Sequence, residues 1–129
     1  MNKLLLFLFL SFGLSAFGQS NSKDIAGPNC DGPDGWAAAM SFTHMKNAGL
    51  IDNKNIDFSK TTTARIASQR LKKDLWHQVY RVSFTKTSGE IVEAIAVHDA
   101  SNEECSMSGV EVFVISKRLG EAPISSKSK

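Results

Sequence analysis

The sequence lacks the motifs that most often reveal an enzyme or a nucleic-acid-binding protein. It contains no phosphate-binding glycine loop, no HExxH, no CxxC and no nucleophile elbow. Its charges nearly balance, with 15 Lys and Arg residues against 13 Asp and Glu. We therefore predict no charge-driven binding to nucleic acid or to an anionic membrane. No paired metal-ligand spacing occurs either, so neither a zinc site nor a cofactor is predicted.

The one long apolar run lies at the N-terminus and has the composition of a secretory signal peptide. A short positive region precedes the apolar residues 4–10, and small residues follow at positions 15, 16 and 18. The run is too short to span a bilayer, and no cysteine follows it closely enough for a lipid anchor. We expect residues 1–18 to be a bacterial-type signal peptide, cleaved after Gly18 or, alternatively, after Ala16. The mature protein is then predicted to be periplasmic or secreted, without a transmembrane segment.

The rest of the chain is long enough for one hydrophobic core and too short for two. We predict a single α+β domain over residues 19–120 and a flexible polar tail over residues 121–129. Without the lysine of the predicted signal peptide, 14 basic residues face 13 acidic ones, and the net charge is about +1.

The chain has two cysteines, Cys30 and Cys105. An even count in an exported protein most simply predicts one disulfide. The bond would close a loop of roughly 75 residues, for which the chain-entropy relation gives about 4 kcal/mol. A catalytic thiol is the alternative, but neither cysteine has a neighbour in the sequence that would activate it.

A helix is predicted over residues 36–48 (WAAAMSFTHMKNA), where apolar residues recur along one side. The turn cluster NCDGPDG precedes it, and Asp31 or Asp34 is expected to cap the free amides of its first turn. Gly49 is expected to end the helix in a Schellman motif.

Four strands are predicted after the helix. The clearest pair is a long hairpin centred on Ser88-Gly89, because both flanks are rich in β-branched and aromatic residues. The predicted order is a polar connection (51–60), a first strand (61–71), the hairpin (75–97), an acidic, serine-rich loop (98–109) and a last strand (110–116).

The hairpin turn could hold two residues or three, and we favour the three-residue loop at positions 87–89. This register places Gly89 where a left-handed conformation is needed and sets Lys86 opposite Glu90. The alternative register would put the Glu93 carboxylate among aromatic side chains, at a cost. The favoured cross-strand pairs are Tyr80 with Ala96, Val82 with Ala94, and Phe84 with Val92.

One helix followed by four strands with short connections predicts an antiparallel meander sheet with the helix across one face. In element order this resembles the cystatin-like group, in which a curved antiparallel sheet cradles a helix. The group's inhibitory QxVxG motif is missing, because residues 78–82 read QVYRV and lack the glycine. The resemblance therefore implies a fold and no protease-inhibitor residues.

A candidate binding surface follows from the hairpin register, which sets His98 opposite Gln78 at one end of the sheet. Its predicted members are Trp76, Gln78, Tyr80, His98 and Asp99. We expect His98 to end its strand at the protein surface, so that replacing it with alanine should leave folding nearly intact.

The same histidine is also the centre of an alternative hypothesis, a metal-binding or catalytic site. His98, Asp99, Glu103 and Glu104 could together hold a divalent cation or perform acid–base catalysis. Convergence of Trp76, Tyr80 and His98 in an open pocket would favour that hypothesis, and packing of these side chains beneath the helix would weaken it.

Two function classes remain. The favoured one is a non-catalytic exported binding module, such as an inhibitor, an immunity-type protein or a ligand-binding protein, with an envelope protein or a small ligand as partner. The other is a small hydrolase or metal-dependent enzyme centred on His98.

Overall fold

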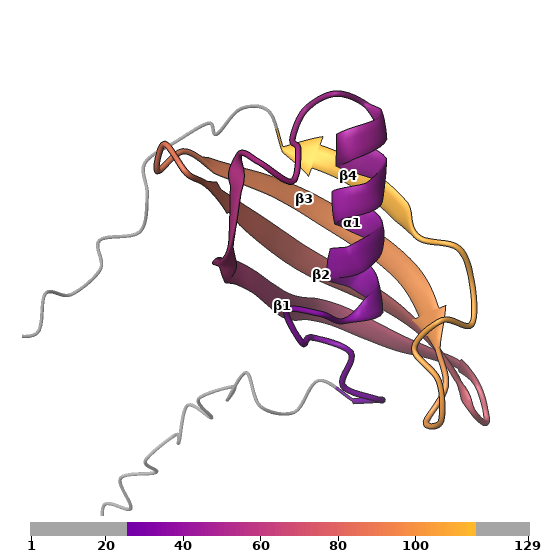
Figure 1. Cartoon of the computed structure of the whole chain (residues 1–129). Coiled ribbons are helices and arrows are strands. Elements are labelled where there is room, and N and C mark those ends of the chain that lie inside the picture. Colours follow the sequence, from indigo (N-terminus) through magenta and orange to yellow (C-terminus); the bar gives the residue numbers. More distant parts are fainter. Residues whose placement is uncertain (1–25, 116–129) are drawn as a thin grey trace, which may run out of the picture.

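The computed structural model describes residues 26–115, so the predicted signal peptide and C-terminal tail lie outside the described part of the chain (Figure 1). The five elements are α1 (Trp36–Asn47), β1 (Ile56–Lys72), β2 (Leu75–Lys86), β3 (Ile91–Ala100) and β4 (Glu111–Ile115). The helix and the strands follow one another as the sequence predicts.

The four strands form one antiparallel sheet in the order β1-β2-β3-β4, and α1 lies across one face of it (Figure 1). This confirms the predicted α+β fold with a helix on a meander sheet. Within residues 26–115, no helix covers the opposite face of the sheet. The helix in this range, α1, lacks the length and apolarity needed to cross a membrane.

The β2–β3 hairpin has the predicted three-residue register. Tyr80 lies opposite Ala96, and the next two predicted pairs also hold. Gly89 adopts a φ of 91°, and its N–H donates to the Lys86 carbonyl at 2.8 Å. Lys86 and Glu90 form the expected ion pair, with Nζ 2.9 Å from Oε2. Glu93 is on the face away from the helix, where its carboxylate accepts a hydrogen bond from Ser83.

The C-terminus of α1 is a Schellman motif, as predicted. The Leu50 N–H donates to the Met45 carbonyl and the Gly49 N–H to the Lys46 carbonyl, both at 2.9 Å. Gly49 has a φ of 74°, which a residue with a Cβ adopts only with strain.

The N-terminus of α1 differs from the prediction, because neither Asp31 nor Asp34 caps it. The N-cap residue is Gly35, and no side chain bonds to the free amides. A Cβ at Gly35 would lie 2.6 Å from the carbonyl oxygen of Cys30. This close approach of two backbone segments requires glycine at the N-cap and so excludes an aspartate from it.

The predicted boundary of the first strand was wrong at its start. β1 begins at Ile56, which pairs with Lys86 and is buried, so part of the predicted polar connection belongs to the sheet. β3 also extends further than predicted, to Ala100, and takes His98 and Asp99 out of the loop. β4 lies within its predicted range.

The disulfide between Cys30 and Cys105 is confirmed, with the two Cα atoms 5.9 Å apart. It ties the segment before α1 to the loop between β3 and β4. Cys30 is part of the core that α1 forms with the sheet, and the largest apolar side chains of this core that are less than 2% exposed are Met45, Tyr80, Val82 and Phe84.

Candidate functional site

The pairing of β1 with β2 is interrupted directly beneath α1. Asp57 lies opposite Thr85, and Thr62 lies opposite Ser83. β1 therefore advances by five residues while β2 advances by two, and residues 58–61 have no partner on β2. A bulge of this size bends the strand locally and re-aims its side chains.

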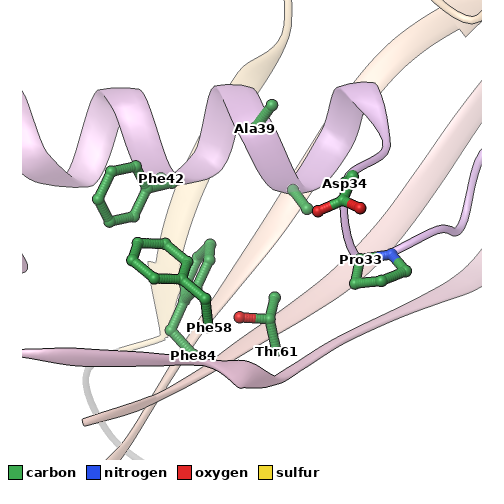
Figure 2. A pocket seen from close by; sticks show the side chains of 8 residues that line it. Pro33, Asp34, Ala39, Phe42, Phe58, Thr61 and Phe84 are labelled. Carbon is green, nitrogen blue, oxygen red and sulfur yellow. The ribbon is translucent and has the colours of Figure 1, made fainter. Parts of the chain in front are cut away.

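The bulge leaves a partly open pocket of about 230 Å³ between β1, β2, α1 and the turn before α1 (Figure 2). We call it the Phe pocket. It is lined by Pro33, Asp34, Ala38, Ala39, Phe42, Phe58, Thr61 and Phe84. Pockets for drug-sized ligands span about 300–1,000 Å³, so this one suits a single ring or a short alkyl group.

Three phenylalanines from three elements form the apolar end of the Phe pocket. The Phe42 ring on α1 lies 5.0 Å from that of Phe58 and 6.0 Å from that of Phe84, edge to face in both cases. Phe84 is fully buried, whereas Phe58 is 47% exposed. The wall formed by Phe84 is therefore fixed in the core, whereas the wall formed by Phe58 is open to solvent.

Asp34 and Thr61 form the polar part of the Phe pocket. Figure 2 shows Asp34 and Pro33 on the side away from the rings of Phe42 and Phe58, and Thr61 between Pro33 and Phe58 with its hydroxyl oxygen on the Phe58 side. The Thr61 hydroxyl oxygen is buried and has no hydrogen-bond partner in the described part of the chain. The Asp34 carboxylate does not bond to the helix amides.

The lysine of the bulge is engaged elsewhere. Lys60 Nζ lies 3.1 Å from the Asp57 carboxylate, which also accepts a 2.6 Å hydrogen bond from the Ser59 hydroxyl. The Ser59 hydrogen bond, followed by Lys60, holds the pKa of Asp57 below its ordinary value. The basic side chain in the bulge is therefore paired with Asp57 rather than with Asp34.

The residues predicted as a binding surface lie in other places. Gln78, Tyr80 and His98 are at most 1% exposed and lie on the sheet face that carries α1. The rings of Tyr80 and His98 stack with centroids 5.3 Å apart. No partner can contact these three side chains without a rearrangement of the core.

Hydrogen bonds to the segment before α1 explain why these polar residues are buried. Tyr80 Oη donates to Gln78 Oε1 at 2.7 Å and accepts from the Cys30 N–H at 3.2 Å. Gln78 Nε2 donates to the Pro28 carbonyl at 2.9 Å. Arg65 of β1 also donates to the Gly27 and Pro28 carbonyls. The network fastens residues 27–30 to the sheet.

Burial raises the pKa of Tyr80 above its ordinary value, although the Cys30 N–H and the nearby Arg65 act in the opposite direction. Desolvation disfavours the phenolate, so the neutral phenol is the form that the fold selects.

Trp76 and Asp99 are the accessible members of the predicted surface, and they do not meet. The Trp76 ring packs against Gly27, where an added Cβ would lie 2.8 Å from it, and Arg70 lies 5.4 Å from the ring centroid. On the opposite face, Asp99 Oδ1 lies 2.6 Å from Nδ1 of His77. Asp99 therefore pairs with His77, which the sequence analysis did not include.

His98, by contrast, has its Nδ1 3.1 Å from the Asp99 carbonyl oxygen, and its Nε2 is buried without a partner in the described chain. Glu103 and Glu104 are exposed. Within residues 26–115, no group of three or more His, Cys, Asp or Glu side chains is placed to hold a metal ion.

Comparisons of the chain with protein-family models, with curated proteins and with solved structures find no match. Function therefore has to be argued from the chemistry of the site.

The Phe pocket was not predicted from the sequence, although part of its sequence pattern is visible. Phe58 stands alone among polar residues in the stretch 57–63 (DFSKTTT), where a strand facing the core would continue its apolar alternation. An isolated aromatic at the start of a polar stretch is the pattern that the bulge produces.

Proposed function

We propose that this protein is a small exported binding module, without catalytic activity of its own, that takes an apolar group of a ligand into the Phe pocket. The observation that carries the proposal is the pocket itself: three phenylalanine rings beside a bulge that exposes one of them. Concave sites with mostly apolar walls and a few polar groups are the usual form of small-ligand sites.

Two features support the exported location. Residues 1–18 have the composition of a cleavable signal peptide. The disulfide between Cys30 and Cys105 is of a kind that persists in oxidising compartments and is rare in the cytosol.

The exposure of Phe58 also supports binding. A half-exposed phenylalanine on a bulge contributes less to the core than Phe84 does, and it offers apolar surface that a ligand can cover. The alternative function, chemistry centred on His98, would require a substrate to reach a side chain that is 1% exposed.

The proposal can be tested with phenethyl alcohol, a neutral probe that carries one aromatic ring, in an NMR titration of the disulfide-bonded protein. We expect saturable shifts for residues around the Phe pocket and a Kd on the order of millimolar for so small a ligand. Phe58→Ala should weaken binding about tenfold, because it removes one aromatic wall.

Phe113→Ala is the matched control, since Phe113 is also an exposed strand phenylalanine but lies on the face away from α1. It should bind the probe as the wild type does. Absence of saturable binding to the wild type, or equal weakening by both substitutions, would refute the proposal.

A further inference from the structure

We infer that the Phe pocket selects a protonated primary amine attached to a phenyl-sized apolar group. The apolar group would lie against the three phenylalanines, and the ammonium between Asp34 and Thr61. This inference rests on the proposed function and adds the chemical class of the ligand.

The Phe pocket has two chemically different parts. The rings of Phe42, Phe58 and Phe84 provide apolar contact and no hydrogen-bonding group. Asp34 and Thr61 provide the carboxylate and the hydroxyl of the lining (Figure 2). A ligand that fills the pocket must therefore be apolar at one end and polar at the other.

Both polar groups of the Phe pocket can accept hydrogen bonds. The carboxylate of Asp34 is acceptor-only when ionised, and no hydrogen bond or ion pair occupies it in the described chain. The Thr61 oxygen is buried and unpartnered, so it can accept from a ligand N–H only after the Thr61 side chain turns toward the open part of the pocket. An ammonium has three donors and no acceptor, which complements this pair.

The local charge of the Phe pocket also favours a cation. Asp34 lines the pocket, whereas Lys60, the basic residue of the bulge, is paired with Asp57. The N-terminus of α1 contributes partial positive charge next to Asp34, but its free amides do not bond to the carboxylate. The net formal charge at the pocket is thus negative, which favours binding of a cation and disfavours binding of an anion. The faces of the phenylalanine rings also attract positive charge.

The test compares three probes of nearly equal size: phenethylammonium, neutral phenethyl alcohol and anionic phenylacetate. In NMR titrations of the wild type at neutral pH and low salt, we expect phenethylammonium to bind about fivefold more tightly than the alcohol. Phenylacetate should bind most weakly. Added salt should reduce the preference for the amine and leave the affinity for the alcohol unchanged.

Asp34→Asn is the decisive variant, because it keeps the shape of the side chain and removes its charge. The position is exposed and makes no hydrogen bond, so the fold should be retained. We expect the preference for the amine to disappear, so that the amine and the alcohol bind about equally, with the affinity for the alcohol unchanged. Thr61→Val should reduce the preference by a smaller factor, since it removes a neutral acceptor.

Glu103→Gln is the matched control. It removes one negative charge from an exposed residue of the loop between β3 and β4, outside the pocket. This variant should keep the full preference for the amine. A preference that survives Asp34→Asn, or that is lost equally in Glu103→Gln, would overturn the inference.

The outcomes also separate this inference from the proposed function. If the wild type binds the alcohol as tightly as the amine, the pocket is a binding site and only the amine selectivity is wrong. If neither probe binds, the proposed function fails and this inference fails with it.

Discussion

Tyr80 and His98 lie ring on ring across the central hairpin, with centroids 5.3 Å apart and planes 7° from parallel. They come from the adjacent strands β2 and β3, on the face that packs against α1. The stack places an imidazole in the core, where the sequence analysis expected it at the surface. Its position reverses our expectation for the stability of a His98 variant.

We now expect His98→Ala to lower the free energy of unfolding by about 2–4 kcal/mol. The substitution leaves a cavity beside Tyr80 and removes the stacked ring. Urea denaturation followed by circular dichroism measures this change. His44→Ala is the control, because His44 is exposed on α1 and its loss should change the stability by less than about 0.5 kcal/mol. Equal effects of the two substitutions would mean that His98 is not packed in the core.

The raised pKa of Tyr80 predicts that the protein loses stability at alkaline pH. Burial raises its pKa in the folded protein above the ordinary value of 10.0. The unfolded chain therefore loses the phenol proton at a lower pH than the folded protein does. The resulting stabilisation is fully present below pH 10.0 and is lost as the pH rises from there through the pKa of the folded state.

This titration can be followed directly, because Tyr80 is the single tyrosine of the chain. The ultraviolet absorbance of tyrosinate should appear at a higher pH in the folded protein than in the denatured protein. Tyr80→Phe should remove this contribution to the alkaline loss of stability, leaving that of the other titrating groups. It should also cost about 1–2 kcal/mol at neutral pH through its lost hydrogen bonds. Coincident titration of the folded and denatured chains would contradict the prediction.

The hairpin and the end of the helix were predictable because local chemistry determines them, whereas the disulfide joins distant segments and was predictable because the chain has two cysteines. Gly89 allows the left-handed turn, and Lys86 pairs with Glu90 across it. Gly49 ends α1 for the same conformational reason. In each case the deciding residue lies within a few positions of the feature that it controls.

The features that the sequence analysis missed depend on contacts between distant segments. The Pro28 carbonyl, 50 residues away in the sequence, provides a buried partner for Gln78. Polar residues such as Gln78 were assigned to a surface because their partners, on the segment before α1, could not be located from the sequence. The bulge at residues 58–61 likewise arises from the pairing of β1 with β2, and the local sequence marks it only by the isolated Phe58.

The disulfide predicts a marked dependence of stability on redox conditions. Reduction should lower the free energy of unfolding by about 4 kcal/mol, because the bond closes a loop with a sequence separation of 75 residues. Urea denaturation with and without reductant measures the difference. A Cys30→Ala/Cys105→Ala variant should be destabilised to a similar extent and should show no response to reductant.

The state of the two thiols is checked on the same sample. Mass spectrometry after alkylation without reductant should find neither Cys30 nor Cys105 modified, since both are in the bond. Two alkylated cysteines would refute the disulfide and, with it, the predicted effect of reduction.

Gly89 offers a test of the turn conformation that is free of steric effects. Its φ is 91°, but a Cβ at this position would meet no atom within 4 Å. Gly89→Ala should therefore destabilise the protein by about 1 kcal/mol through backbone strain alone. Thermal or urea denaturation measures the change.

Gly109→Ala provides the matched control, because a Cβ there would also meet no atom within 4 Å and its φ is not in the left-handed region. It should be neutral or stabilise by up to about 1 kcal/mol, since alanine restricts the unfolded chain more than glycine does. If Gly89→Ala were as well tolerated as Gly109→Ala, the three-residue turn would be wrong. The cross-strand pairs that place His98 beside Tyr80 would then have to be reassigned.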